Sequence, residues 1–435
     1  MRPSPNLEYA PFGYKKGDSI VKCIKEINIL INNFIEYKSD SIELENQPYS
    51  HDKIINLINN ESQYNHDSIK FLPLDRLNSI DEKELCLKVI NNVVDSGNFT
   101  SGPYIQLVEN IIKEYYTAKY CIATSSGTDA IKIGLIAAGI KAGDEVIVPL
   151  NSFAATENAI FSIGASPVYA NIDESFNIIP SEIERLITKR TKAVLPVCLY
   201  GSTKNIRDVF ALAKKYNIKT LIDAAQCFGV TDIIKHCDFL FLSFNPFKNI
   251  GSFGKSGAIL TNSDEGYSRS RQISYHGFFE GKKNIKSINW GYNCRMDNLQ
   301  AATLHSKINY FEHNAIKRTY LAHRYLKELK KLNENKFKLP IETIENTWHL
   351  FPLIVDENKR DQLVEFAKKR NIEFDVYYPV LSHKHETDYA KNYLEPIQFE
   401  KSEQLHSSLV HIPLHNHMSI YEQDKIIEVI HDFFK

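Results

Sequence analysis

A lysine at the end of a strongly apolar run is the first residue of this sequence that could do chemistry. Lys248 follows the run FLFLSF (239–244) and lies in a loop that Pro246 and Gly251 punctuate. A lysine that is partly desolvated in a pocket can have a lowered pKa and act as a Schiff-base nucleophile. Because most loop lysines are simply solvated, the segment on its own also fits a surface loop.

A carboxylate ends another apolar run in the same way. Asp223 closes the buried part of TLIDAA (220–225), and Gln226 follows it. In open α/β sheets, ligands gather outside the carboxyl ends of the strands. A carboxylate at that point can hold a cationic ligand nitrogen. An aspartate that only caps the next loop is the alternative.

A third segment combines small and hydroxyl-bearing residues between a predicted strand and a predicted helix. It reads SSGTD (125–129) and includes Gly127 and Thr128. Small residues let backbone N–H groups approach a phosphate, and the start of a helix carries partial positive charge. The same residue types also cap helices for purely structural reasons, so a plain helix cap is the alternative.

The order of these segments carries more information than any one of them. Along the chain come the possible phosphate cradle, an aromatic loop with Phe153, the acid Asp223, then Ser243 and Lys248. A pyridoxal 5'-phosphate (PLP) enzyme needs a Schiff-base lysine, an acid for the pyridine nitrogen and an anion cradle. Read together, the segments predict a PLP site.

Two other patterns imitate binding sites but lack required residues. GKS (254–256) resembles the end of a Walker A motif, yet Asn249 stands where the first glycine is needed and an apolar strand follows. Four histidines between 406 and 417 have no HExxH motif and no acidic partner at ligand spacing. No GxGxxG follows a strand. We therefore expect no P-loop, no metal site and no Rossmann dinucleotide site.

The elements that must position these residues can be read from the apolar pattern. Short apolar runs alternate with helix-length segments such as 129–139, 181–188 and 205–216, which predicts an α/β fold with a parallel or mixed sheet covered on both faces. The runs are 120–124, 145–150, 166–171, 193–200, 220–225, 239–244 and 257–261. A long helix is expected over 297–332.

The two ends of the chain read differently from this central part. Amphipathic helical pieces are expected at 20–35 and 51–60, without a motif that carries chemistry. After the long helix, apolar runs at 349–355, 371–380 and 409–414 alternate with helical segments, which indicates a smaller α+β domain. No internal repeat is present, which argues against solenoids and propellers.

Composition limits the classes of partner. With 52 Lys+Arg against 53 Asp+Glu, the formal charge is −1, so the chain has no electrostatic signature of nucleic-acid binding. No apolar stretch is long enough to span a bilayer, and no signal-peptide pattern opens the sequence. Seven cysteines without a CxxC pair fit reduced thiols. We expect a cytoplasmic protein that acts on small molecules, with no nucleic-acid or membrane partner.

Several motifs together resemble one family. They are FTSGPY (99–104), SSGTDAI (125–131), NSFAATENAI (151–160), DAAQ (223–226), SFNPFK (243–248) and WGYNCRMDNLQAA (290–302). On these strings, residues 71–435 resemble the sugar aminotransferases of the DegT/DnrJ/EryC1/StrS family. The resemblance implies fold type I of the PLP-dependent transferases, which is aspartate-aminotransferase-like. We expect an N-terminal extension (1–70), a large PLP-binding domain with a mixed seven-stranded sheet (71–310) and a small C-terminal α+β domain (311–435).

The resemblance also implies roles for single residues. Gly127, Thr128 and Ser243 match the ligands of the cofactor phosphate, and Phe153 matches the ring that stacks on the pyridine. Asp223 and Gln226 match the partners of the pyridine nitrogen and the ring hydroxyl. Lys248 matches the lysine that joins the cofactor, and with Asp223 it is expected to be catalytic. Asn293 matches a residue that reaches the cofactor phosphate of a neighbouring subunit, which implies a homodimer with shared active sites.

The substrates follow from the same resemblance. The expected donor is L-glutamate, and the expected acceptor is a keto-sugar, 3-oxo-glucose-6-phosphate, which would give kanosamine 6-phosphate in antibiotic biosynthesis. Candidates for binding the sugar are His276, Arg295, Tyr378 and His383. A nucleotide-linked 3- or 4-keto-sugar as acceptor, or a catalytically silent PLP-binding regulator, remain alternatives. The sequence departs from the usual family pattern at Cys198, at 297–298 and at 255–256, which bears on the identity of the sugar.

Overall fold

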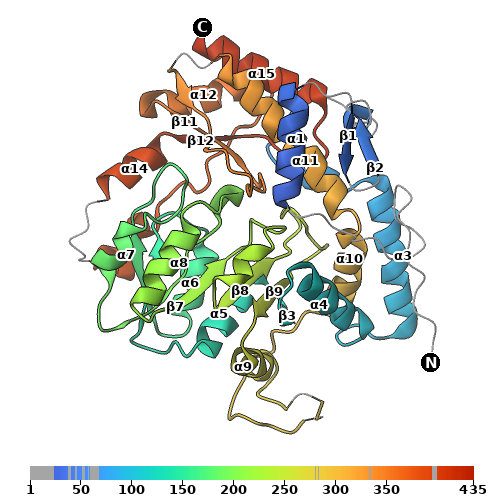
Figure 1. Cartoon of the computed structure of the whole chain (residues 1–435), viewed down its shortest axis with the longest axis vertical. Coiled ribbons are helices and arrows are strands. Elements are labelled where there is room, and N and C mark those ends of the chain that lie inside the picture. The colour runs from blue at the N-terminus through green and yellow to red at the C-terminus, as the bar shows by residue number, and fades with distance from the viewer. Residues whose placement is uncertain are drawn as a thin grey trace.

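The computed structural model shows a mixed sheet between two layers of helices, with a smaller sheet beside it (Figure 1). It describes residues 24–37, 41–44, 47–50, 54–56, 58, 68–279, 281–282, 284–332, 335–393 and 399–435. Most of the predicted N-terminal extension, including most of the expected helix at 51–60, lies outside these residues.

The large sheet has seven strands in the order β3-β9-β8-β7-β6-β4-β5. Neighbouring strands from β8 to β5 run parallel, whereas β9 is antiparallel to both β3 and β8. The strands are β3 (Tyr120–Thr124), β4 (Glu145–Pro149), β5 (Ser166–Ala170), β6 (Thr191–Val194), β7 (Lys219–Asp223), β8 (Phe239–Ser243) and β9 (Gly257–Thr261). Each of the seven predicted apolar runs overlaps one of these strands, although β6 ends six residues before the run 193–200 does, and the predicted mixed seven-stranded sheet is confirmed.

The strands are apolar on both faces because both faces are covered. In β9, Ile259 packs in one core with helices α5 (Gly127–Ala137), α6 (Ala154–Phe161) and α9 (Asp264–Ser274). Its neighbours Ala258 and Leu260 face the opposite core, with α4 (Pro103–Tyr115), α7 (Ser181–Leu186) and α8 (Ile206–Lys215). Successive strand side chains point to opposite faces, so one strand serves two cores.

The predicted long helix at 297–332 is two helices. α10 (Asn298–Ile308) packs on α3 (Ile80–Ser96) and α4, whereas α11 (Phe311–Lys330) packs on α1 (Ile24–Tyr37) and α15 (Ile420–Phe434). The break falls at Asn309 and Tyr310. The two halves therefore belong to different parts of the packing, and the chain turns between them.

A second sheet of three strands follows, in the order β10-β11-β12, with both pairs antiparallel. Its strands are β10 (Phe337–Lys338), β11 (Phe351–Val355) and β12 (Leu409–Ile412). The apolar run at 371–380 was expected to belong to this α+β part as a strand, but it makes only isolated bridges, at Ile372 and Asp375. The remaining elements are β1 (Ser41–Leu44), β2 (Gln47–Ser50), α12 (Glu357–Lys368), α13 (Asp388–Lys391) and α14 (Glu400–Ser407).

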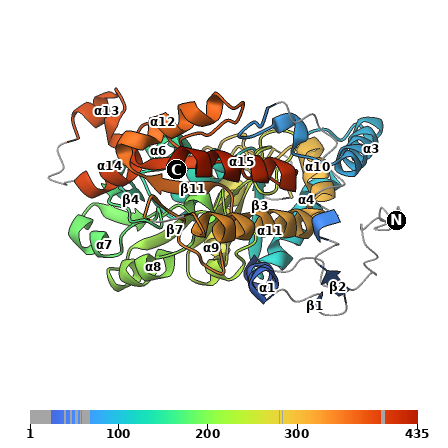
Figure 2. The same cartoon turned by 90° about the horizontal axis from the view of Figure 1, so that it is seen from above.

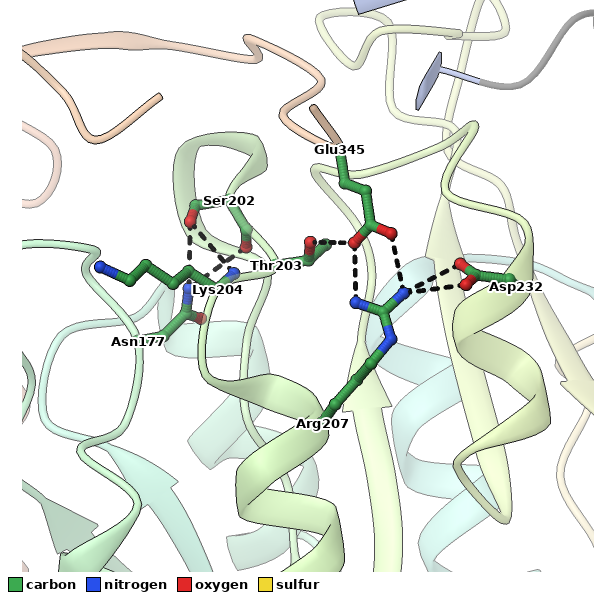
Figure 3. Close-up of polar contacts among 7 residues, drawn as sticks. All are labelled: Asn177, Ser202, Thr203, Lys204, Arg207, Asp232 and Glu345. Atoms are coloured by element: carbon green, nitrogen blue, oxygen red, sulfur yellow. Dashed lines mark hydrogen bonds and ion pairs between the residues drawn. The ribbon is translucent and has the colours of Figure 1, made fainter. Parts of the chain in front are cut away.

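Polar contacts link α8, which covers the large sheet, to the segment that leads into the small sheet. Arg207 on α8 donates to Glu345 at 2.8 and 2.9 Å and to Asp232 at 3.0 Å, and Thr203 donates to Glu345 at 3.0 Å (Figure 3). Glu345 lies in the segment that leads into β11.

The side on which α11 and α15 lie is nearest the viewer in Figure 2. Within the described ranges, every helix is too short or too polar to cross a membrane.

Candidate active site

A cavity opens where β7 and β8 end and α5 begins. Its volume is about 600 Å³, within the range of small-molecule sites. The walls come from the loop after β4, the ends of β7 and β8, the loop after β8 and the segment 377–378. The lining includes Ser126, Gly127, Thr128, Ser152, Phe153, Asp223, Gln226, Ser243, Lys248, Lys255 and Tyr378.

Lys248 reaches this cavity from a tightly closed loop. Its backbone N–H donates to Asn245 O at 2.9 Å, and Ser252 N donates to Phe244 O at 2.9 Å. A Cβ at Gly251 would lie 2.5 Å from Pro246 O, so the closure requires glycine there. Burial lowers the pKa of Lys248 to about 8, and the charge of Asp223 opposes this shift. A substantial fraction of the amine is therefore neutral and nucleophilic near pH 8.

Asp223 is held in one orientation at the end of β7. Thr156 Oγ1 donates to its Oδ2 at 2.9 Å, and Ala225 N donates to its Oδ1 at 3.1 Å. The side chain is buried, and burial raises its pKa although both hydrogen bonds and Lys248 work in the opposite direction. The ionised form of a buried carboxylate is stabilised by a cation close to it, and a protonated pyridine nitrogen is such a cation.

Gln226 and two aromatic rings form the next part of the wall. Gln226 Oε1 accepts from Tyr200 N at 2.6 Å, which leaves its Nε2 to donate to the Tyr378 hydroxyl at 3.3 Å. The rings of Phe153 and Tyr378 lie 5.5 Å apart. Phe153 is 53 % exposed, which is unusual for a phenylalanine, and its open face is part of the cavity lining. A flat aromatic ligand fits against such a face.

The start of α5 forms the anion-binding end. Ser126 caps the helix by accepting from Asp129 N at 3.0 Å. A Cβ at Gly127 would lie 2.8 Å from Ser243 Cβ, so the helix and β8 approach as closely as glycine allows. The first N–H groups of a helix have no intrahelical acceptor and attract anions. Gly127, Thr128 and Ser243 could therefore hold a phosphate.

The acid next to this cradle is neutralised. Asp129 forms an ion pair with Lys132 at 2.8 Å and accepts from Ser125 Oγ at 2.6 Å. Burial raises the pKa of Asp129, but these contacts outweigh it and leave the pKa below its usual value. The carboxylate charge is compensated by Lys132, so it does not oppose a phosphate at the helix start.

Four predicted residues lie outside the cavity of this chain. Asn293 is exposed, and Arg295 stacks on the Tyr275 ring at 3.4 Å. His276 lines a separate surface pocket. All three belong to the arm after α9, residues 275–296, whose middle part projects from the bottom of the molecule in Figure 1 and whose end returns to β3, where Arg295 bridges Thr124. His383 is held elsewhere, with its Nε2 2.7 Å from Glu403 Oε1.

Three residues at the site were not predicted. Thr156, in the first turn of α6, fixes Asp223, and its only sequence signal was its position in the motif NSFAATENAI. His349 Nδ1 lies 2.7 Å from Asn249 Oδ1, which steadies the residue after Lys248. Lys255 lines the cavity, whereas the sequence suggested only a false Walker A ending and a departure from the family pattern.

The fold and this cavity define an aminotransferase of fold type I. Seven of the eight predicted cofactor residues line one cavity. Their chemical groups fit PLP, because the cavity combines an anion-binding helix start closed by Gly127, a buried carboxylate and a lysine whose pKa is lowered. A sequence profile of the DegT/DnrJ/EryC1/StrS aminotransferase family matches residues 80–431. The chain belongs to this family.

Individual relatives support the assignment. The chain is 42% identical over 375 residues to the 3-oxo-glucose-6-phosphate:glutamate aminotransferase of Bacillus subtilis, covering 86% of this chain and 85% of the relative. It is 35% identical over 373 residues to the dTDP-3-amino-3,6-dideoxy-alpha-D-galactopyranose transaminase of Aneurinibacillus thermoaerophilus, covering 84% and 99%. The crystal structure of NtdA from Bacillus subtilis with bound cofactor PMP superposes with a TM-score of 0.88 at 38% identity, covering 95% and 98%.

Proposed function

We propose that this protein is a PLP-dependent aminotransferase that moves an amino group from L-glutamate to 3-oxo-glucose-6-phosphate and so makes kanosamine 6-phosphate. The observation that carries the proposal is the cavity in which Lys248, with a pKa of about 8, faces Asp223. The substrates are taken from the relative in Bacillus subtilis that is 42% identical and is named for this reaction.

The cavity residues divide the work of holding the cofactor. Gly127, Thr128 and Ser243 would bind its phosphate, and Phe153 would stack on its ring. Asp223 would hold a proton on the pyridine nitrogen, and Gln226 would donate to the ring hydroxyl. When bound, PLP supplies an electron sink for the negative charge that develops at the substrate carbon.

Lys248 is the group of this chain that moves protons during the reaction. Near pH 8 its amine exists in both protonation states, so it can take a proton from the donor carbon and return one to the acceptor carbon. Proton transfer by a positioned group is typically worth about 10²–10⁴-fold. Thr156 and Ala225 keep the Asp223 carboxylate in one orientation, in which it would hold the pyridine nitrogen of the bound cofactor.

We also propose that the enzyme works as a homodimer with shared sites. The arm after α9 carries Asn293 and Arg295, and it exposes large apolar side chains such as Phe279 and Trp290. Exposed apolar groups on a projecting segment are typical of subunit contacts. The arm of one subunit would bring Asn293 to the cofactor phosphate of the other. A cytoplasmic location is consistent with the free thiols of the six described cysteines.

Two alternatives are supported by other relatives. The relative in Aneurinibacillus thermoaerophilus is named for a dTDP-linked sugar, which favours a nucleotide-linked keto-sugar as acceptor. A relative from Geobacillus stearothermophilus, 33% identical over 80% of this chain, is named a pleiotropic regulatory protein. A regulator of this kind would hold the cofactor without turnover.

A comparison of acceptors tests the proposal. Holoenzyme that has been converted by L-glutamate is mixed with 3-oxo-glucose-6-phosphate or with a dTDP-linked 3-keto-sugar, and the return of the starting absorbance is followed. We expect fast return only with the sugar phosphate. Faster return with the nucleotide-linked sugar would contradict the proposed acceptor, and no conversion by glutamate would favour the regulator.

A further inference from the structure

Lys255 is a second lysine of the cavity, and the proposed mechanism does not use it. It lines the same cavity as Lys248 and is exposed to solvent at its rim. Gly257, two residues on, abuts the cradle, because a Cβ there would lie 2.7 Å from Gly127 N. The lysine is therefore attached close to the anion-binding end.

The backbone that carries Lys255 is fixed. Ser252 is fully buried, and its Oγ lies within hydrogen-bond distance of Phe244 O (3.0 Å), Gly254 O (2.7 Å) and Ser256 Oγ (2.8 Å). A Cβ at Gly254 would lie 2.7 Å from the Gln300 side chain, so the turn is also closely packed from outside. The long side chain therefore extends from a rigid base.

The charges around the cavity leave Lys255 available. Asp129 is paired with Lys132, and Asp223 is held by Thr156 and Ala225. Among the described residues, no carboxylate lies within ion-pair distance of the Lys255 ammonium. Apart from Lys248, which is needed for proton transfer, Lys255 is the only cationic side chain of the described lining.

We propose that Lys255 binds the phosphate monoester of the acceptor sugar and so selects phosphorylated keto-sugars. The inference rests on the proposed function, which it deepens. The residues proposed for the cofactor phosphate are Gly127, Thr128 and Ser243, whereas Lys255 is a solvent-exposed residue of the cavity lining that an incoming substrate can reach. A phosphate monoester carries a charge of about −1.5 to −2 near neutral pH. Lysine binds such a group as a flexible point charge.

Binding of unreactive sugars to the holoenzyme tests this inference. Isothermal titration calorimetry with glucose 6-phosphate and with glucose gives the contribution of the phosphate. For Lys255→Gln we expect the affinity for glucose 6-phosphate to fall about 10- to 100-fold, as for a hydrogen bond to a charged group, with that for glucose unchanged. Lys255→Arg, which keeps the charge, should retain most of the affinity.

Lys204→Gln is the matched control. Lys204 is exposed, and its amine points away from the Arg207 contacts in Figure 3. This control should bind both sugars as the wild type does. If Lys255→Gln binds glucose 6-phosphate as tightly as the wild type, the inference is wrong.

Three further outcomes separate the possible failures. If Lys255→Gln loses PLP on dialysis but keeps the preference for glucose 6-phosphate, the lysine serves the cofactor phosphate and the inference is overturned. If the wild type binds glucose and glucose 6-phosphate equally, the inference and the proposed acceptor both fail. If the preference is present but no amine is transferred, the proposed reaction fails while the phosphate site stands.

Discussion

The pKa of Lys248 is set by two opposing influences. Burial disfavours the ammonium form and lowers the pKa to about 8, while the carboxylate of Asp223 favours the ammonium form. Opposing influences also act on Asp223. Burial raises its pKa, its hydrogen bonds and the charge of Lys248 lower it, and burial has the larger effect. The two groups are therefore coupled, and a change at one should be visible in the titration of the other.

Cofactor uptake by the apoenzyme should report this coupling. Only the neutral amine of Lys248 attacks an aldehyde, so the rate of covalent PLP attachment should rise with pH and level off above about 8. Asp223→Asn removes the charge that favours the ammonium form, so the midpoint should move to lower pH. Stopped-flow absorbance between pH 6 and 10 measures both. A wild-type midpoint near 10.5, or a midpoint raised by Asp223→Asn, would contradict this description.

At the scale of elements, the contact between α5 and β8 shapes the anion-binding end. Gly127→Ala keeps an allowed backbone but places a methyl group 2.8 Å from Ser243 Cβ. We expect the free energy of unfolding in urea to fall by about 1–3 kcal/mol, as for other overpacked sites. We also expect weaker PLP binding, because the start of α5 must move away from Ser243 and so widen the cradle.

The double variant Gly127→Ala, Ser243→Gly is the control for this clash. It removes the atom that the methyl group would meet, so it should be less destabilised than the sum of the two single changes. Strict additivity of the two changes would show that Ser243 is not the cause.

Strands were easier to predict from the sequence than the connections between them. Each strand of the large sheet is buried on both faces, so its sequence is a nearly continuous apolar run. Such a run can be recognised in the sequence without knowing which segments pack on it. The break at Asn309 and Tyr310 could not be seen, because it depends on which helices pack on α10 and α11. The segment 371–380 is apolar because it lines the cavity and packs on β12, for example through the Tyr377–His411 ring contact, and not because it is a strand.

The same limit applies to the site. The residues from Gly127 to Lys248 were found because each ends or follows a strand, and strand ends meet at one edge of a sheet. Thr156 acts on Asp223, which is distant in sequence, and Lys255 lines a cavity most of whose residues are distant in sequence. Their place at the cavity follows from the packing of α6 and β9, which local patterns do not encode.

At the scale of the whole molecule, segments far apart in the chain complete one structure. Arg76, before α3, forms a buried ion pair with Glu422 at the start of α15, at 2.7 Å. Arg207 ties α8 to the segment that leads into the small sheet. Tyr377 and Tyr378, from beyond α12, close the cavity that β7 and β8 begin. The predicted large and small domains must therefore be docked for the site to exist.

We expect this cavity to transfer nitrogen from glutamate to a sugar phosphate by means of Lys248. The most direct test gives the holoenzyme L-[¹⁵N]glutamate and 3-oxo-glucose-6-phosphate and follows the sugar by mass spectrometry. We predict a ¹⁵N-labelled amino-sugar phosphate with the wild type and none with Lys248→Ala. An unlabelled sugar with the wild type, or label transferred undiminished by Lys248→Ala, would show that the transfer does not take place in this way.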